Sequence, residues 1–388
     1  MSDYKIVELT PAQKQIIKDS VPVLRSAGEA LTTAFYKNMF ADFPEVRSFF
    51  NQSNQASSAQ PKILAYAILK YAENIDDLTP LLTFVKTIVA KHVGLQVRAE
   101  DYHVVGASLI KTMKQLLGDM ATEEFIEAWT VAYGNLAKIL IDLEAEEYSH
   151  QEWSGFKPFK VVKIENECSD VKSVYFAPLD GKLTPGLPGQ YVSIRFQIPG
   201  DDYECTRSYS LSQLTKANEY RISVKRAPFG KVSGYIHEHL KVGDILRVAP
   251  PSGEFVYNAE AKKPIKFIIG GIGITPVMPM LEKALPDSLP VTLYYANRGE
   301  DRAFVDILAG YKERYPHFKV IEHISDEPSI DQAIDEVKYG KLNPEDIDAD
   351  HEDEVYLLGP VSFMTDMRDH LVKRSITPKL EFFGPVVV

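Results

Sequence analysis

Residues 265–276 read IKFIIGGIGITP, and this stretch decides the fold of the last third of the chain. Its first half, Ile265–Ile269, is an apolar run with the length of a buried strand. The turn that follows contains Gly270, Gly271, Gly273, Thr275 and Pro276. Glycines let a backbone approach a pyrophosphate closely, and proline suits the first turn of a helix. We therefore predict a nucleotide-binding α/β domain over residues 263–388.

The middle third, residues 155–258, has a different pattern. Short alternating runs such as Val171–Phe176 and Tyr191–Phe196 are broken by proline and glycine, which predicts an antiparallel β-domain. The tetrapeptide RSYS at 207–210 lies between two such strands, and GKVS at 230–233 opens a helical run. Backbone N–H groups at a helix start bind phosphate well, so these two segments together predict a phosphate-bearing cofactor.

The first third, residues 1–147, is predicted to be all-α, and residues 148–154 (YSHQEWS) to be a linker. His92 continues a helical apolar stripe formed by Leu78, Leu81, Leu82, Val85 and Val89. Such a histidine is either a core side chain with a satisfied hydrogen bond or the axial ligand of a haem iron.

Glu146 ends a second apolar stripe, formed by Phe125, Trp129, Ala132, Leu136, Ile139 and Leu143. A carboxylate is rarely buried without a partner. We therefore expect Glu146 either to lie in water at a frayed helix end or to accept the ring proton of a metal-bound His92, which makes that ligand more electron-donating.

The composition excludes several classes of protein. The 388 residues carry a net charge of −11, which argues against nucleic-acid binding. No apolar run approaches the roughly 20 residues of a transmembrane helix, and the first residues have no signal-peptide core. The two cysteines, Cys168 and Cys205, form no CxxC pair, so a reducing, cytoplasmic location is expected. The acidic stretch 344–354 has His351 where a calcium loop needs glycine, so we interpret it as a solvated loop.

The segments TAFYKNMF, KHVGLQV, DYHVVG and EAWTVAYGNLAKILIDLEAEEY resemble the globin domain of flavohaemoglobins, and the resemblance runs along the whole chain. It implies haem b with His92 as proximal ligand and Tyr102 and Glu146 as its supporting residues, with Lys91 beside them. On the distal side it implies Phe35, Tyr36, Gln60 and Leu64. Pro61 disfavours helical geometry at Gln60, so the reach of Gln60 into the pocket stays open.

The rest of the chain resembles the ferredoxin-reductase type, with an antiparallel β-barrel that binds FAD and an α/β domain that binds NADH or NADPH. The resemblance implies FAD-binding roles for Gln190, Tyr191, Arg207, Tyr209, Ser210, Gly230, Lys231, Val232 and Ser233. It implies nucleotide-binding roles for the 270–276 turn and for Gly359 and Pro360, and places Glu381 and Phe383 near the flavin. Leu358 stands where the family often has cysteine. An acidic residue near Asn297 would favour NADH, whereas Arg298 leaves NADPH open.

The resemblance implies nitric oxide dioxygenase activity, in which electrons from NAD(P)H pass through FAD to haem and NO reacts with O2 to form nitrate. NO, O2 and NAD(P)H are the expected partners, with no obligatory protein partner. Two alternatives are an oxygen carrier or sensor, and a flavin reductase with other acceptors such as hydroperoxides. A carrier needs only a globin, and the reductase-like part of the chain argues against it.

Overall fold

The computed structural model describes residues 4–50, 59–216, 218–299 and 301–381, with the side chains of residues 59–61 outside this description. The chain divides into two compact units. One contains Met1–Gly155 and Gln197–Thr206, and the other contains Phe156–Phe196 and the described residues from Arg207 onward. Each unit is described by itself below.

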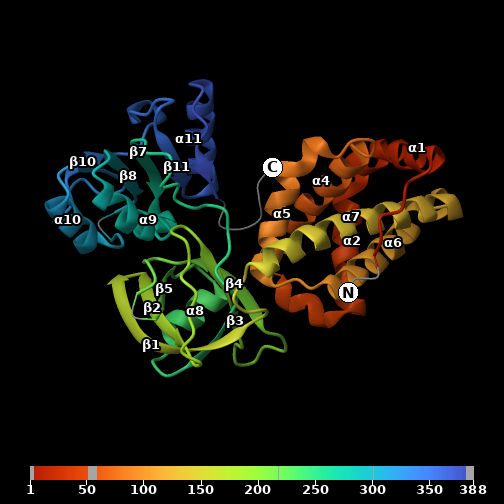
Figure 1. Ribbon diagram of the computed structural model, residues 1–388, viewed down its shortest axis with the longest axis horizontal. Coiled ribbons are helices and arrows are strands. Elements are labelled where there is room, and N and C mark those ends of the chain that lie inside the picture. The colour runs from red at the N-terminus through yellow and green to blue at the C-terminus, as the bar shows by residue number, and fades with distance from the viewer. Residues whose placement is uncertain (1–3, 51–58, 217, 300, 382–388) are drawn as a thin grey trace. The chain divides into compact units, whose positions relative to one another are not determined.

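The first unit is built around packed helices (Figure 1). They are α1 (Pro11–Asp19), α2 (Val21–Asp42), α4 (Ala59–Glu73), α5 (Leu82–Leu95), α6 (Tyr102–Leu117) and α7 (Glu123–Ser149), joined in part by short 3-10 segments. Thr10 begins α1 with a reciprocal capping box, and Thr122 caps α7 by accepting from the Phe125 amide. α7 continues through Ser149, two residues into the segment predicted as linker.

Small residues allow close helix contacts in this unit. A Cβ on Gly28 of α2 would lie 3.4 Å from Ala65 of α4, and one on Gly106 of α6 would clash at 2.5 Å with the ring of Tyr133 of α7. Trp129, only 2% exposed, is among the largest side chains of the core that these helices share. None of the helices in the described residues is long and apolar enough to cross a membrane.

The second unit begins with a six-stranded sheet in the order β4-β3-β6-β1-β2-β5, whose recorded pairings are antiparallel. Its strands are β1 (Lys157–Cys168), β2 (Val171–Pro178), β3 (Tyr191–Phe196), β4 (Cys205–Ser210), β5 (Tyr220–Lys225) and β6 (Ile245–Val248). Leu211, directly after β4, forms an antiparallel bridge with Ile222 of β5. This bridge joins the two edge strands, so the sheet closes into a barrel, with α8 (Lys231–Glu238) between β5 and β6 in the chain.

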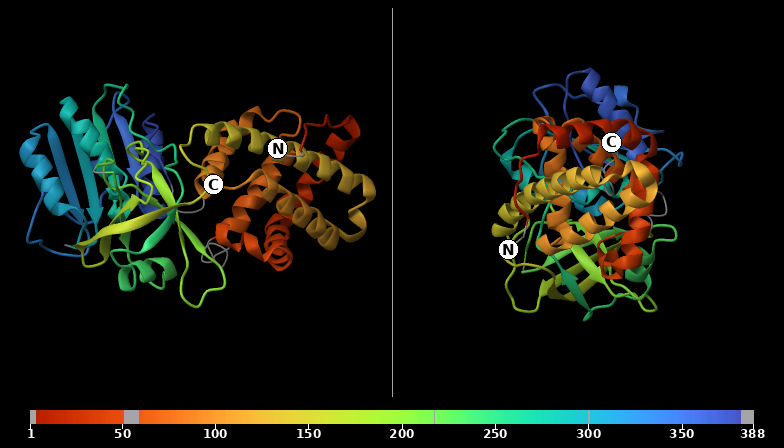
Figure 2. Two further views of the ribbon diagram at one scale, coloured as in Figure 1. Left: turned by 60° about the horizontal axis from the view of Figure 1, so that its bottom comes forward. Right: turned by 90° about the vertical axis from the view of Figure 1, so that its right-hand side faces the viewer.

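A parallel six-stranded sheet follows, in the order β10-β9-β8-β7-β11-β12. Its strands are β7 (Ile265–Gly270), β8 (Val291–Asn297), β9 (Phe318–Ile324), β10 (Glu336–Tyr339), β11 (Glu354–Leu358) and β12 (Lys379–Leu380). Alternate residues of β7 point to opposite faces: Phe267 packs with α9 (Val277–Ala284) and α10 (Val305–Arg314), and Ile268 with α11 (Val361–Lys373). Figure 2 shows these strands and helices from two further sides.

The predicted fold class is confirmed: a helical part is followed by an antiparallel barrel and then a parallel α/β sheet. The run Ile265–Ile269 falls within β7, and the glycine turn after it leads into α9 through a 3-10 segment, Gly271–Ile274. Burial on both faces explains why β7 reads as a continuous apolar run rather than an alternating one.

Candidate functional site

His92 lies in the last turn of α5, where two side chains from other helices meet its ring. Its Nδ1 lies 2.7 Å from Oε1 of Glu144 on α7 and 3.0 Å from the hydroxyl of Tyr102, the first residue of α6. The Tyr102 hydroxyl also donates to Glu144 Oε1, at 2.5 Å. Glu144 is 2% exposed and the His92 side chain 31%. Three helices therefore meet in one hydrogen-bonded triad.

The triad fixes how His92 can be used. A carboxylate only accepts hydrogen bonds, so Nδ1 of His92 carries the proton and Nε2 is left as a metal ligand. Burial, and then the charge of Glu144, raise the pKa of Tyr102 far above its ordinary value, so its hydroxyl stays a donor. A histidine with its second nitrogen held by a carboxylate is the arrangement that a proximal haem ligand requires.

The expectation that Glu146 supports His92 is wrong. Glu146 is exposed, and the contact belongs to Glu144, two residues earlier on α7. The buried face of α7 includes Ala132, Ala137 and Leu140 before it reaches Glu144. The sequence stripe passed over Ala137 in favour of larger apolar residues, and this moved its end by half a turn. Lys91, beside His92 on α5, is half-buried.

The residues predicted for the distal side lie on α2 and α4. Phe35 and Tyr36 of α2 are buried, with ring centroids 5.0 Å apart, and Phe50 packs edge-on against Tyr36. Burial raises the pKa of Tyr36 well above its ordinary value, so its hydroxyl remains protonated. Leu64 of α4 packs against the same core. The backbone of Gln60 belongs to the first turn of α4, whereas its side chain lies outside the described residues.

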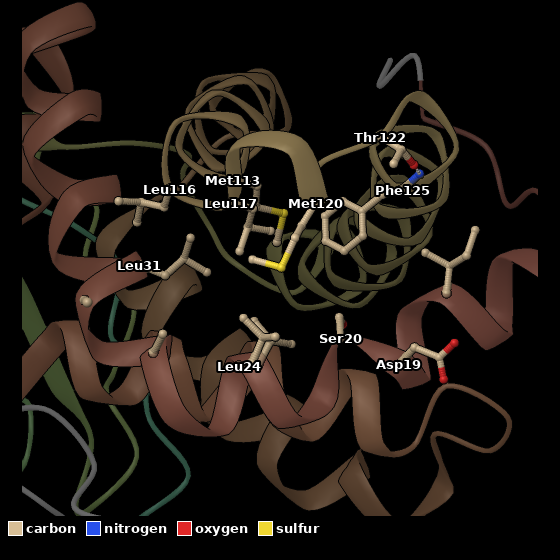
Figure 3. Close-up of a pocket in the computed structure, with 14 residues that line it drawn as sticks. Asp19, Ser20, Leu24, Leu31, Met113, Leu116, Leu117, Met120, Thr122 and Phe125 are labelled. Atoms are coloured by element: carbon tan, nitrogen blue, oxygen red, sulfur yellow. Dashed lines mark hydrogen bonds between the residues drawn. The ribbon is translucent and has the colours of Figure 1, made fainter.

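A cavity of about 450 Å³ lies elsewhere in this unit (Figure 3). Side chains of α1, α2, α6 and α7 line it, with Leu31 and Leu116 toward one end and Asp19 toward the other. None of the predicted haem residues lines it.

In the barrel, Gln190 directly precedes β3, which begins with Tyr191, and β4 contains Arg207, Tyr209 and Ser210. Tyr191 exchanges two backbone hydrogen bonds with Ser252, and Gln190 links its side chain to the Leu187 amide at 2.9 Å. A Cβ on Gly253 would lie 2.9 Å from the Tyr191 ring and 4.0 Å from a carboxylate oxygen of Glu381. Burial, and then the Glu381 charge, raise the pKa of Tyr191. Glu381 is thus beside the predicted flavin residues, whereas Phe383 lies outside the described residues.

β4 supplies the RSYS tetrapeptide. Tyr209 packs edge-on against Phe196, with centroids 6.4 Å apart, and burial raises the pKa of Tyr209 while the Arg207 charge opposes this. Ser210, at the end of β4, is 7% exposed.

The GKVS segment forms the start of α8, as predicted. Gly230 is the N-cap residue and no side chain caps the helix there, so the helix start suits a phosphate group. A Cβ on Gly230 would lie 2.4 Å from Ser233 Oγ and 2.8 Å from Ala227 Cβ. The turn therefore requires glycine. Lys231 is exposed, and Val232 and Ser233 are buried.

In the parallel sheet, the two predicted glycine turns pack against each other. A Cβ on Gly270 would lie 2.9 Å from Pro360 Cδ, and one on Gly273 would lie 2.9 Å from the Leu358 carbonyl oxygen. The turns close the carboxyl ends of β7 and β11, where open α/β sheets bind ligands. Thr275 is 3% exposed and its hydroxyl donates to the Ile272 carbonyl. Pro276 is the N-cap residue of α9. Gly271 has φ +54, a value that glycine adopts without strain. Leu358, at the position where the family often has cysteine, is fully buried in the core.

Asp326 and Glu327 lie near the end of β8, and the sequence pattern did not predict this position. The Asp326 amide donates to the Arg298 carbonyl at 2.6 Å, and a Cβ on Gly299 would lie 3.4 Å from Glu327 Cγ. Asp326 and Glu327 each come 28 residues after the position they meet in space, Arg298 and Gly299 respectively. Only the pairing of β8 with β9 reveals this proximity.

Comparisons with known proteins agree with this geometry. The globin family model matches residues 33–140, the oxidoreductase FAD-binding domain model residues 158–257, and the oxidoreductase NAD-binding domain model residues 267–369. A flavohemoprotein of Candida albicans is 52% identical over 99% of this chain and 98% of its own length. One of Schizosaccharomyces pombe is 46% identical over 99% and 94%.

The chain belongs to the flavohaemoprotein family.

Solved structures extend the likeness. A flavohemoglobin from Malassezia yamatoensis with bound FAD and heme matches 97% of this chain and 100% of its own, with 27% identity and a TM-score of 0.87. The FAD/NAD-binding domain of a nitric oxide dioxygenase from Vibrio cholerae covers 60% of this flavohaemoprotein and 100% of its own chain, with 30% identity and a TM-score of 0.55. The predicted cofactors, haem, FAD and a nicotinamide nucleotide, are confirmed by these matches.

Proposed function

We propose that this flavohaemoprotein is a nitric oxide dioxygenase. The overall reaction is 2 NO + 2 O2 + NAD(P)H → 2 NO3⁻ + NAD(P)⁺ + H⁺, in which the nucleotide supplies two electrons. When bound, FAD accepts a hydride and delivers single electrons to haem iron, where O2 and NO react. The observation that best supports the proposal is the His92–Glu144–Tyr102 triad in a chain that also contains both reductase domains.

The proximal residues set the character of the iron ligand. Glu144 is buried, and its carboxylate oxygen accepts the Nδ1 proton of His92, which makes Nε2 a stronger electron donor. Tyr102 holds the carboxylate in place from α6. Stronger donation to the iron favours reaction of oxygen over reversible carriage. A carrier would need neither this donation nor an attached reductase.

The distal residues act on the substrates. Tyr36 keeps its proton because burial raises the pKa of its phenol, so its hydroxyl is available as a hydrogen-bond donor to a polar ligand. Phe35 and Leu64 add apolar surface, which suits small uncharged molecules such as NO and O2. We infer that Gln60 contributes a second polar group.

The reductase residues position the two redox partners. Arg207 and the start of α8 hold the FAD phosphates, while Tyr209 and Ser210 contact the flavin ring. The missing Cβ atoms let the turns at Gly270–Gly273 and Gly359–Pro360 pack against each other, and the exposed protein backbone of such a glycine turn would approach the pyrophosphate of the nucleotide. Glu381 and Tyr191 lie at the junction between the barrel and the parallel sheet, where hydride transfer would take place.

The test measures NADH oxidation, NO consumption and nitrate formation by the purified full chain under air. We expect NO to accelerate NADH oxidation, with two NO consumed and two nitrate formed per NADH. If NO adds nothing to NADH oxidation, the proposal fails. His92→Ala is the matched control, because it should abolish the Soret band and the NO-dependent rate while leaving electron transfer from NADH to ferricyanide.

A further inference from the structure

The loop between β5 and α8 contains a strained turn. The Gly230 amide donates to the Ala227 carbonyl at 3.0 Å, which closes a four-residue β-turn with Pro228 and Phe229 at its centre. Phe229 has φ +58. A turn with proline second and a positive φ third is a type II turn, whose third position strongly favours glycine or asparagine. A bulky aromatic residue with this backbone geometry is an outlier.

Packing does not explain why a phenylalanine occupies this position. The side chain of Phe229 is fully exposed, at 107% of the reference value, so its ring is buried against nothing in the described structure. The residue therefore carries backbone strain and exposes a large apolar ring to water. Strained residues of this kind persist where the surrounding structure holds them, and they cluster at ligand clamps.

The position of the turn indicates the ligand. Gly230 is both the last residue of the turn and the N-cap of α8, where the FAD phosphates are expected. Ser233 of α8 accepts a hydrogen bond from the Ala227 amide and donates one to the Gly230 carbonyl. These bonds tie the turn to the helix start, so Phe229 is held one residue ahead of the phosphate site.

We propose that Phe229 is a positioning residue for FAD and that its ring stacks on the adenine. FAD consists of a flavin half and an AMP half joined through the pyrophosphate. The residues of β4 take the flavin half, and the AMP half continues beyond the phosphates. Every base has a flat π-face that an aromatic ring can cover. Stacking removes the exposed ring from water and compensates for the strained backbone, and neither benefit exists without the adenine.

The proposal separates Phe229 from a general role in folding, because FMN lacks the adenine. The full chain, loaded with haem and freed of flavin, is titrated with FAD and separately with FMN, and flavin fluorescence reports binding. Phe229→Leu should weaken FAD binding by about 5- to 150-fold, the range expected for loss of one aromatic–base stack, and should change FMN binding by less than about twofold. Phe229→Trp, which keeps an aromatic face, should bind FAD as the natural chain does.

A second measurement tests the strain. Phe229→Gly removes both the ring and the unfavourable φ, so it should bind FAD as weakly as Phe229→Leu. In the flavin-free protein it should also raise the Tm of the transition that FAD addition shifts, whereas Phe229→Leu should not. Unchanged FAD affinity in Phe229→Leu would overturn the proposal. So would an equal loss for FAD and FMN, which would mean that the residue only shapes the phosphate turn. Neither readout depends on NO turnover, so the proposed dioxygenase activity is tested separately.

Discussion

Replacing Glu144 by glutamine tests the proximal triad with the smallest possible change. The side chain keeps its size and one carbonyl oxygen but loses its negative charge. In the natural chain, the Oε1 atom of Glu144 accepts hydrogen bonds from His92 Nδ1 at 2.7 Å and from the Tyr102 hydroxyl at 2.5 Å. Glutamine can retain both contacts in neutral form, so any effect reports the charge rather than a cavity.

The expected magnitude follows from the two bonds. A hydrogen bond to a charged group contributes about 1.5–3 kcal/mol and one between neutral groups about 0.5–1.5 kcal/mol, so neutralising the acceptor removes about 2–3 kcal/mol over two bonds. The carboxylate is 2% exposed, and relief of its desolvation offsets part of this loss. A net loss of about 1.4–2.7 kcal/mol corresponds to a 10- to 100-fold weaker hold on haem, the range typical of residues that support a metal ligand.

Three measurements on the haem-loaded chain check the prediction. Haem transfer to an acceptor apoglobin should be about 10- to 100-fold faster in Glu144→Gln. The Fe–His stretching frequency should fall, because a less anionic imidazole binds iron more weakly. The haem midpoint potential should rise, since the donation that stabilises the ferric state is reduced, with each tenfold effect equal to about 59 mV for one electron.

The chain provides its own control two residues along the same helix. Glu146 is exposed, so Glu146→Gln makes the same chemical change in water and should leave all three measurements as in the natural chain. Equal effects of the two substitutions would refute the assignment of Glu144. An unchanged stretching frequency in Glu144→Gln would show that the charge does not reach the iron ligand, even if haem is lost faster.

Other parts of the structure make further predictions. Tyr36→Phe should slow NO-dependent NADH oxidation at least tenfold. Burial raises the pKa of the Tyr36 phenol, so its contribution to folding stability is complete below pH 10.0, its ordinary pKa, and is lost as the pH rises above that value. The free energy of unfolding should therefore fall less at alkaline pH in Tyr36→Phe than in the natural chain. Glu327→Lys should raise the ratio of kcat/KM for NADPH to kcat/KM for NADH about tenfold, because lysine attracts the 2′-phosphate of NADPH. The same charge change in Glu313→Lys on α10 should leave the ratio unchanged. An unchanged ratio in Glu327→Lys would show that Glu327 does not lie at the nucleotide site. Gly189→Ala would place a Cβ 1.9 Å from the Phe255 carbonyl oxygen at φ +108 and should cost more than about 3 kcal/mol in a denaturant titration, against about 1 kcal/mol for Gly181→Ala, which has φ +70 and no neighbour within 4 Å.

The sequence predicted the elements whose signal is local. The apolar run Ile265–Ile269 and the glycines after it define a strand and a turn through their own chemistry, and the structure places both as expected. The start of α8 at Gly230 is equally local, since a glycine and a serine three residues later form the turn by themselves. Contacts between distant segments gave no such signal. The approach of Glu327 to Gly299 arises from strand pairing in the parallel sheet.

The position of the buried carboxylate shows why a local pattern can be off by half a turn. Glu144 and Glu146 lie about half a turn apart on α7, and each ends its own line of apolar residues: Ala137 and Leu140 lead to Glu144, and Ile139 and Leu143 lead to Glu146. After Ala132 the sequence stripe was traced through the larger Leu136, Ile139 and Leu143, but the buried face of α7 continues through Ala137 and Leu140 to Glu144. Only the position of His92 and Tyr102 on other helices selects Glu144.

The triad and the Phe229 turn share one physical logic. Each is costly when considered in the protein alone: a carboxylate is taken out of water at Glu144, and a phenylalanine occupies a glycine-type backbone position. Two hydrogen-bond donors meet part of the cost at Glu144. A cationic metal on His92 Nε2 would attract the carboxylate further, just as an adenine would cover Phe229. Cofactor loading should therefore stabilise this flavohaemoprotein at both places, and the stabilisation by haem should be smaller in Glu144→Gln than in the natural chain, because the neutral side chain no longer needs the positive charge.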